Sequence, residues 1–446
     1  MSTPETTAEH TDGPPVMYLS QLLRSPVLAR SGEVVGRVED VIVRLRGSDV
    51  YPLVTGIVAA VGGRQVFIGS PSIAEYAPGR VVLAKNKVDL RGFERREGEV
   101  LLRADLLGHR LIDVAAVELI RAYDVRLEDT GAGWVLTRLD TRRPPRLFGL
   151  IKGSGGHAPR DWKAFEPLIG DSRSIAVRRV SGRVAALKPA QIADLLEEAD
   201  KAEGGEILDR VRSFPELEAD VFEELDPDKA SRLLDDMPDD EVAALLGRMR
   251  ADDAADAIAD LRQSRRRRVL DLMPAPQRTK VITLMGFNPE SAGGLMNVDF
   301  VSCAATATAA QTLALVAAAR TIQPEALIKV HVLDEDERLA GVVSVIALLQ
   351  AEPDESVGTL MDSDPVRVSA DADLTDIALL MADFNLYSVP VVDERDRVLG
   401  VVTVDDVLEA TIPEDWRRRE PAPRPVREIT PSEDDCDAPV PGGEAR

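Results

Sequence analysis

The sequence predicts a multidomain α+β protein: an N-terminal antiparallel β-barrel-like domain, then an α-helical superhelical solenoid, then a tandem pair of α/β modules. Three observations lead to this prediction. Short apolar runs separated by glycine and polar turns fill residues 17–150, a 12-residue helical cycle follows in residues 185–288, and one α/β pattern occurs twice in residues 289–415. The length of 446 residues leaves room for several such domains.

Composition limits the classes of partner and compartment. The formal net charge of −23 opposes binding to nucleic acid phosphates, although an acidic balance also serves solubility alone. The two cysteines lie far apart, and the four histidines show no zinc spacing. The polar residues 1–16 read as a disordered leader without the apolar core of a signal peptide. No stretch has the roughly 18 apolar residues of a spanning helix. We therefore expect a soluble, cytoplasmic protein with no transmembrane segment.

The N-terminal region, residues 17–150, is rich in strand patterns. The runs VVGRVEDVIVRL, YPLVTGIVAAV and GRQVFIG are short and separated by turn residues. A weaker echo relates residues 31–45 to residues 105–127, so either two small barrels or one composite β domain would fit. The glycine-containing opening of these units resembles that of the PRC-barrel fold. Residues 151–184 read as a linker whose Gly-Ser-Gly-Gly lacks the ending of a phosphate loop.

Residues 185–288 repeat a helical pattern every twelve residues. Each cycle begins with a large apolar residue and has an apolar pair or near-pair further on, and all but the Leu261 cycle have proline or aspartate near the start; the cycles begin at Leu225, Met237, Met249, Leu261 and Met273. Proline and aspartate both suit a first helical turn. Twelve residues make about two turns of helix plus a corner. We therefore predict a superhelical solenoid, with one generic helical bundle as the alternative.

The C-terminal third repeats itself without a gap. Residues 330–350 read VHVLDEDERLAGVVSVIALLQ, and residues 389–409, which start 59 positions later, read VPVVDERDRVLGVVTVDDVLE. Each copy reads as strand, turn, strand and helix. The pairs Leu295-Met296 and Leu360-Met361 open the two copies. We predict two modules, residues 289–357 and 358–415, which form a pseudo-symmetric pair with a cleft between them. Residues 416–446, rich in proline and charge, read as a disordered tail.

The segment that joins the solenoid to the modules carries the most specific resemblance to a known family. It reads NPESAGGLM and resembles the E-x-A-G-x-L-M segment of MgtE-type magnesium transporters at Glu290, Ala292, Gly293, Leu295 and Met296. The cytosolic part of that family is a helical superhelix followed by two CBS modules, and the resemblance covers residues 185–415. In the family a transmembrane channel follows the second module, whereas this chain continues in a polar tail. The resemblance therefore implies a detached sensor rather than a transporter.

The resemblance also implies Mg²⁺ as a ligand. In the family, carboxylates of the helical domain and the CBS modules hold Mg²⁺ between them and favour a compact state; magnesium keeps several waters, so few carboxylates suffice. The matching positions are Asp252 and Asp256 in the solenoid and Asp373, Asp406, Glu409, Glu414 and Asp415 in or after the second module. Asp252 and Asp256 share one helix face, where a plain solvated surface is the alternative. Arg232, Thr375 and Asn385 stand where family carboxylates are expected, so the number of sites stays open.

CBS modules often bind adenine nucleotides through a G-h-h-[ST]-x-x-D pattern. In the family the hydroxyl faces phosphate and the aspartate accepts hydrogen bonds from the ribose. Thr403 and Asp406 satisfy the pattern, and Val366 and Pro390 complete the expected site. The first module has Ala347 in place of the aspartate, so we expect at most one site for ATP, ADP or AMP. Both ligand hypotheses use Asp406, and a helix-start cap is its structural alternative.

The arginine run at residues 265–268 is the one dense basic segment. It would meet solvent, an acidic partner, an anionic lipid surface or the acidic face of its own solenoid. No hydrolase, metalloprotease or nucleotide-loop motif is present, so we expect no enzyme. Two apolar helices, residues 312–319 and 378–384, predict a homodimer through the CBS modules.

The lead interpretation is a soluble regulatory protein. It would sense Mg²⁺ through the acidic helical and CBS regions and adjust a partner such as a membrane transporter. A sensor of adenine nucleotides is the second interpretation. The third is a scaffold that docks through its PRC-like domain.

Overall fold

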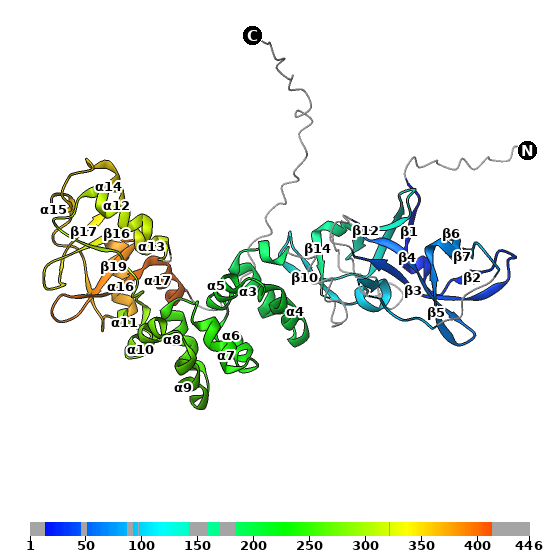
Figure 1. The fold of residues 1–446 in the computed structure, drawn as a ribbon, viewed down its shortest axis with the longest axis horizontal. Coiled ribbons are helices and arrows are strands. Elements are labelled where there is room, and N and C mark those ends of the chain that lie inside the picture. Colours follow the sequence, from blue (N-terminus) through cyan, green and yellow to red (C-terminus); the bar gives the residue numbers. More distant parts are fainter. Residues whose placement is uncertain are drawn as a thin grey trace, which may run out of the picture. The chain divides into compact units, whose positions relative to one another are not determined.

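The computed structural model describes residues 14–45, 51–86, 92–96, 98–141, 159–168, 183–320 and 322–412. The chain forms two compact units, Met1–Thr279 and Lys280–Arg446. The first contains the β region and most of the helical region, and the second contains the repeated modules (Figure 1). The predicted leader lies almost entirely outside the described residues, and the predicted tail lies entirely outside them.

The N-terminal region is a barrel-like, nearly closed sheet, as predicted. Its strands follow the order β1-β11-β12-β4-β3-β2-β7-β6, with β13 beside β12, β5 beside β4 and β8 beside β3. Their bounds are β1 Val16–Tyr18, β2 Pro26–Leu28, β3 Val34–Arg44, β4 Leu53–Val61, β5 Arg64–Gly69, β6 Ile73–Ala77, β7 Arg80–Leu83, β8 Glu99–Leu101, β11 Asp124–Asp129, β12 Trp134–Asp140 and β13 Arg160–Asp161. β11 and β12 lie between β1 and β4, so strands from both ends of the region share this sheet. Of the sequence echo, residues 31–45 contain β3 of this sheet, whereas residues 105–127 reach it only with β11.

A second, small sheet adjoins the first helices. It has the order β10-β9-β14, with bounds Glu118–Arg121, Arg110–Asp113 and Phe165–Pro167. Residues 160–167 were predicted as linker, but they pair with β12 and β9 and so belong to the β region. Glu166 also forms a buried ion pair with Arg210 of α4 (Lys201–Val211) at 2.8 Å. A charge pair of this kind escapes sequence reasoning because its partners are distant along the chain.

The helical region follows the predicted cycle. Its helices are α3 Pro189–Glu198, α4 Lys201–Val211, α5 Pro215–Glu223, α6 Pro227–Asp235, α7 Asp239–Leu246, α8 Ala251–Asp260, α9 Gln263–Leu272 and α10 Ala275–Leu284. From α6 to α10 a helix begins every twelve residues. The large apolar residue that opens each cycle is buried in all five cycles. Alternate helices pack together, α3 on α5, α5 on α7, α6 on α8 and α7 on α9, which is the stacking of a solenoid.

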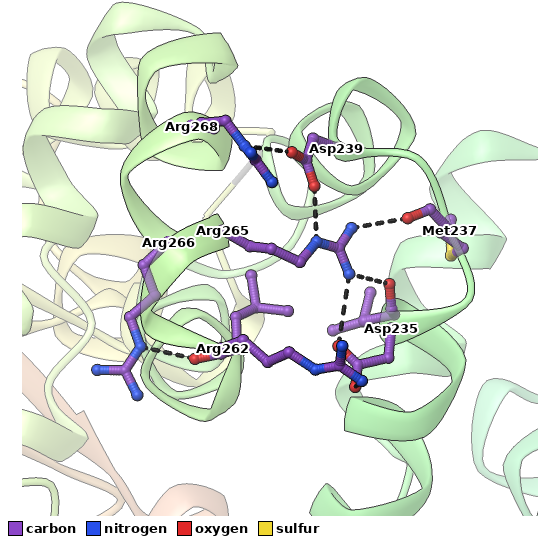
Figure 2. Close-up of polar contacts among 9 residues, drawn as sticks. Asp235, Met237, Asp239, Arg262, Arg265, Arg266 and Arg268 are labelled. Carbon is purple, nitrogen blue, oxygen red and sulfur yellow. Dashed lines mark hydrogen bonds and ion pairs between the residues drawn. The ribbon is translucent and has the colours of Figure 1, made fainter.

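The arginine run lies on α9 and packs against its own solenoid. Arg265 donates to the carbonyl oxygens of Leu234 and Met237, where α6 ends, at 2.9 and 2.7 Å. Its Nε donates to Asp239 at the start of α7, and Arg268 donates to the other oxygen of Asp239 (Figure 2). Arginine suits this place because its planar fork can bond several acceptors at once. Of the roles considered for the run, contact with the solenoid is the one these two side chains adopt.

The two repeated modules have matching sheets. Module 1 contains β15 Ser302–Ala304, α12 Ala309–Ala318, α13 Pro324–Leu327, β16 Lys329–Leu333, β17 Leu339–Ser344 and α14 Val345–Gln350; module 2 contains β18 Val368–Ser369, α16 Leu374–Phe384, β19 Ser388–Val392, β20 Val398–Thr403 and α17 Val404–Thr411. The sheet orders are β15-β16-β17 and β18-β19-β20. Lys329 pairs with Ser344 and Ser388 with Thr403, so the 59-residue repeat keeps its register. The predicted α/β pair is confirmed.

Each module is crossed by a segment that precedes the other module's strands. The first crossing segment, residues 292–297, contains α11 (Ala292–Leu295), and Asn297 exchanges backbone hydrogen bonds with Val401 of module 2. The second, residues 357–362, contains α15 (Val357–Leu360), and Asp362 exchanges the same bonds with Val342 of module 1. The sequence suggested that each segment opens its own module. The structure instead places each segment on the opposite module.

A glycine in each module permits this crossing. A Cβ atom at Gly341 would lie 2.5 Å from the carbonyl oxygen of Asp362, and one at Gly400 would lie 2.7 Å from that of Asn297. Real Cβ atoms do not approach a carbonyl oxygen so closely, so a larger residue would push the crossing segment away. The repeated glycine is therefore a packing requirement of the pair.

We predict that Gly341→Ala and Gly400→Ala each destabilise the second unit by about 1–3 kcal/mol, because the added methyl overpacks the crossing. Urea denaturation of the full chain, with amide hydrogen exchange read out for residues 290–412, measures the effect on this unit. Gly205→Ala is the control. Gly205 lies in α4 with no atom close to its missing Cβ, and alanine there should add about 0.5–1 kcal/mol. Unchanged exchange protection in both crossing variants would contradict the packing argument.

Candidate functional site

Each module sheet has one buried face that carries polar side chains, here called the inner face. Strand residues alternate between two faces, so Val330 and Val332 enter the module 1 core while His331 lies on the opposite face. His331 is 0% exposed, and Ser388 and Thr403 on the inner face of module 2 are 1% and 0% exposed. Polar groups at this depth need partners, so these positions are where a ligand site is to be sought.

Thr403 and Asp406 come together as the sequence pattern predicts. Thr403 ends β20 and stands at the N-cap of α17, and Asp406 lies one turn into that helix. The Thr403 hydroxyl donates to the Asp406 carboxylate at 2.6 Å. In module 1, Ser344 is the counterpart of Thr403, and its hydroxyl instead accepts from the Ala347 backbone N–H. The serine is thus a helix cap, whereas Thr403 and Asp406 form a hydroxyl–carboxylate pair.

The other two predicted nucleotide residues lie on β19 and just before β18. Pro390 is buried in the middle of β19, opposite Val401 of β20. Val366 is half-buried and lies two residues before β18. Proline is unusual in a central strand because it has no N–H for the ladder. The parallel pairing of β18 with β19 begins only after it, at Val368 and Val391.

Ser388 is a site residue that sequence reasoning missed. It lies opposite Thr403 in the β19–β20 ladder. Its hydroxyl is buried, and no hydrogen-bond partner for it is found among the described residues. The available signal was the polar residue two positions before Pro390 in the run SVPVV, on the same strand face.

The predicted solenoid carboxylates lie on α8 in an environment that disfavours their charge. Asp252 is buried, and Asp256 follows one turn later. The Asp256 side chain is exposed at the surface of α8, but its surroundings still desolvate it in part, and this desolvation, with the like charge of Asp260 adding to it, raises the pKa of Asp256 from 3.8 to about 6. Burial likewise raises the pKa of Asp253, with a further contribution from the neighbouring Asp252. Arg250 donates to Asp253 at 2.5 Å and partly offsets this charge. A bound cation would likewise favour the charged form of these carboxylates.

The predicted module 2 carboxylates are in different surroundings. Asp373 is the N-cap of α16 and accepts from the Asp376 N–H at 3.0 Å. Glu409 is exposed on α17, one turn after Asp406. Glu414 and Asp415 lie outside the described residues. Within the described ranges, no group of three or more histidine, cysteine, aspartate or glutamate side chains is placed to hold a metal ion.

Two departures from the family pattern have local explanations. Asn385 ends α16 in the left-handed conformation at φ 50°, where asparagine is tolerated better than a carboxylate-bearing glutamate. Arg232 is exposed on α6, 3.9 Å from Asp228. Neither side chain can ligate a cation as a carboxylate does.

The helices of the modules also expose apolar side chains. Leu315 lies on α12, and Leu379 and Phe384 lie on α16, the two helices from which a homodimer was predicted. Ile346 and Leu349 on α14 are exposed as well. Exposed apolar residues at this density suit a protein interface. The homodimer nevertheless stays a prediction.

The β region has a hollow of about 390 Å³ that includes Glu39, Asp40 and Arg103. Burial raises the pKa of Asp40 to about 6. Its carboxylate accepts from the N–H groups of Arg103 and Ala104 at 2.7 and 3.0 Å, at the start of a π turn, Leu102–Leu106. Asp40 therefore has a structural task, and docking through this region also stays a prediction.

Three family models match the chain. The MgtE intracellular N domain matches residues 187–290, the CBS domain residues 357–412, and the PRC-barrel domain residues 14–90. These matches confirm the resemblances drawn from the NPESAGGLM joint, the repeat and the N-terminal strands. Among the described residues, none of the helices has the length and apolar character to cross a membrane.

Similar proteins include two curated magnesium transporters and one solved structure. The magnesium transporter MgtE of Thermus thermophilus is 36% identical over 161 residues, 35% of this chain and 36% of that protein. MgtE of Enterococcus faecalis is 30% identical over 126 residues, 28% of each protein. The chain thus spans about a third of the length of these relatives. The crystal structure of the cytosolic domain of the Mg²⁺ channel MgtE in complex with ATP is 30% identical, with a TM-score of 0.50, and the match covers 54% of this chain and 95% of that one.

The raised pKa of Asp256 predicts a pH dependence of stability in the absence of a cation. Because the folded pKa of about 6 exceeds the ordinary value of 3.8, the protonated form is favoured by folding. This contribution is fully present below the unfolded pKa and is lost as the pH rises through the folded one. In Asp256→Asn, the free energy of unfolding should therefore fall less between about pH 4 and pH 7, by on the order of 1 kcal/mol after screening by solvent. Urea denaturation at both pH values measures this.

Asp271→Asn is the matched control, since Asp271 is exposed on α9. It should leave the pH dependence as in the wild type. An Asp256 variant with the wild-type dependence would show that this carboxylate is not destabilised by its surroundings.

Proposed function

We propose that this chain, which resembles the cytosolic domain of MgtE and has a PRC-barrel-like region before it, is a regulatory protein that senses Mg²⁺. Its output would be the activity of a partner, for which a membrane transporter is the natural class because the relatives are magnesium transporters. The matched domains are regulatory modules, so we propose no catalytic role.

The observation that carries the proposal is the destabilised charge on α8. Burial and like charges raise the pKa values of Asp253 and Asp256. A divalent cation near these carboxylates would lower the repulsion and stabilise the ionised state. The acidic character of the whole chain, −23 at pH 7, adds a general repulsion that the same cation screens.

The residues fit a hydrated Mg²⁺ rather than a dehydrated one. Asp252 and Asp256 offer two carboxylates one turn apart, and no third ligand joins them within the described residues. Magnesium gives up its waters reluctantly, so one or two carboxylates and several waters make an ordinary site. Affinity in the millimolar range follows, since a site of this kind gains little beyond charge neutralisation. In module 2, Asp406 and Glu409 offer a second such pair, one turn apart on α17.

We predict that Mg²⁺ at millimolar concentration protects the joint around Glu290 to Met296 from proteolysis in the full chain. Neutralised carboxylates let the acidic helical and CBS regions take up the compact state proposed for them, and a compact state shields the segment between them. The Asp252→Asn/Asp256→Asn double variant should shift the half-protecting Mg²⁺ concentration upward several-fold. Limited proteolysis followed by mass spectrometry reads the cut site.

Asp228→Asn is the control, because Asp228 is an exposed acid on α6, paired with Arg232, and is not one of the two predicted ligands. Sodium chloride at equal ionic strength separates specific binding from general screening. A protection curve that is the same in the double variant as in the wild type would remove α8 from the sensing mechanism.

An adenine nucleotide is the second ligand we propose, with the Thr403–Asp406 pair as the supporting observation. The pair places a hydroxyl beside a carboxylate at the end of β20, with the Ser388 hydroxyl across the ladder. A ribose diol could replace the Thr403 hydroxyl as donor to the carboxylate. The solved MgtE cytosolic domain to which this chain is similar was crystallised in complex with ATP.

We predict that calorimetry on the full chain finds no more than one ATP, ADP or AMP per chain, and that Asp406→Ala weakens binding by on the order of tenfold or more. The loss reflects a charge-assisted hydrogen bond of about 1.5–3 kcal/mol. Asp405→Ala is the neighbouring control. Two equal sites in the wild type, or wild-type affinity in Asp406→Ala, would contradict the assignment.

A further inference from the structure

The small sheet β10-β9-β14 lies outside both of the domains that match at the two ends of the first unit. The PRC-barrel match ends at residue 90, and the MgtE N-domain match begins at residue 187. On one side the small sheet shares the core of the β region, because Leu111 of β9 and Phe165 of β14 belong to the same cluster of buried apolar residues as the large sheet. On the other side α3 packs against β10. The small sheet therefore connects two domains that are recognised separately.

Arg110 of β9 joins this sheet to the end of α3 and the start of α4. Its guanidinium donates to the carbonyl oxygen of Glu198 and to the carboxylate of Glu203, each at 3.3 Å, and also to the Glu198 carboxylate. Glu203 in turn accepts from the N–H of Asp200, the N-cap residue of α4, at 3.0 Å. The planar guanidinium can bond several acceptors at once, so one side chain holds the strand, the end of one helix and the start of the next.

Arg210 joins the other end of α4 to the same sheet. Its Nε lies 2.8 Å from the carboxylate of Glu166 on β14, and its other nitrogens donate to the carbonyl oxygens of Pro167 and Glu206 at 2.8 and 2.7 Å. The Arg210 and Glu166 side chains are only 4% and 1% exposed. The second Glu166 oxygen accepts from the N–H of Val184, just before α3, at 3.2 Å. Because a buried charge is costly without its partner, this pair favours a single arrangement of α4 on β14.

The two contacts lie at opposite ends of α4. Glu203 and Arg210 are seven residues apart, which is about 10 Å along the helix. They bond different strands, β9 and β14, which are neighbours in the small sheet. A single contact could act as a hinge, whereas two contacts at this separation resist rotation about either one. Relative motion is the ordinary expectation for two domains of one chain, so this double attachment is a specific feature of the junction.

We propose that the β region, α3 and α4 form one rigid body, fixed at Arg110 and Arg210, and that this body is the output arm of the protein. The second statement rests on the proposed Mg²⁺ function. When a cation alters the helical region, the β region moves with it, and a partner docked on the β region is displaced by the same movement. A flexible connection would instead let the helical region change without any consequence for such a partner.

Distances between spin labels in the full chain test the rigid body and the output role separately. Labels at Ser72→Cys in the β region and Gly205→Cys in α4 span the junction, and labels at Gly205→Cys and Glu335→Cys in module 1 span the two units; all three positions are exposed. The native cysteines are replaced through Cys303→Ser and Cys436→Ser. Pulsed electron spin resonance should give one narrow distance across the junction, the same with and without millimolar Mg²⁺. The distance between the units should change with Mg²⁺.

Two variants remove the fixing points one at a time. Arg110→Ala removes the first, and Arg210→Lys keeps the charge of the second but loses the fork that bonds several acceptors. Each should broaden the distance across the junction. Arg121→Ala is the matched control, because Arg121 is exposed, lies opposite Arg110 on β10, and donates to the Gly108 carbonyl oxygen within the β region; it should keep the narrow distance. Circular dichroism confirms that each variant is folded, and if Arg210→Lys fails to fold, Arg110→Ala decides.

The outcomes distinguish the inference from the function on which its second part rests. A broad or Mg²⁺-dependent distance across the wild-type junction overturns the rigid body, whatever the two units do. A distance that stays narrow in folded Arg110→Ala and Arg210→Lys overturns the role given to these arginines. A fixed junction without any Mg²⁺-dependent change between the units supports the rigid body, and it overturns the output role together with the proposed Mg²⁺ response.

Discussion

The second unit depends on the contact of each crossing segment with a glycine in the opposite module. Asn297 bonds the edge of β20 and Asp362 the edge of β17, and each passes too close to Gly400 or Gly341 for any side chain. These contacts bind the two modules into one pair and complete the edge of each sheet. They also fix the end of β20, and with it Thr403 and the start of α17, on which the nucleotide assignment rests.

Much of this architecture could be read from local patterns. The 12-residue spacing of Met237, Met249 and Leu261 predicted the helix starts, because the repeat length and the burial of each leading residue depend only on one helix and its neighbour. The 59-residue repeat predicted the ladder register because a copied unit keeps its own pairing. Thr403 and Asp406 could be paired from sequence, because residues three positions apart at the start of a helix lie close together.

The remainder depends on contacts between distant parts of the chain. Nothing in the local pattern of residues 160–167 shows that they pair with β12 and β9, or that Glu166 meets Arg210. The crossing of the two segments was not predicted, because the same sequence is compatible with a segment that packs on its own module and with one that packs on the other module. The raised pKa of Asp256 likewise depends on the residues that surround α8. Ser388 could be recognised as a site residue only once the structure placed it opposite Thr403 in the ladder.

The regular spacing of α6 to α10 limits which insertions and deletions the solenoid can accommodate. Each step of the superhelix uses twelve residues and buries its leading apolar residue. Insertion or loss of a whole step returns every later helix to an equivalent position and merely lengthens or shortens the stack. Any other change in length turns the later apolar faces out of the core. We therefore expect this region to accommodate length changes in multiples of one step, because only these keep the later helices in register.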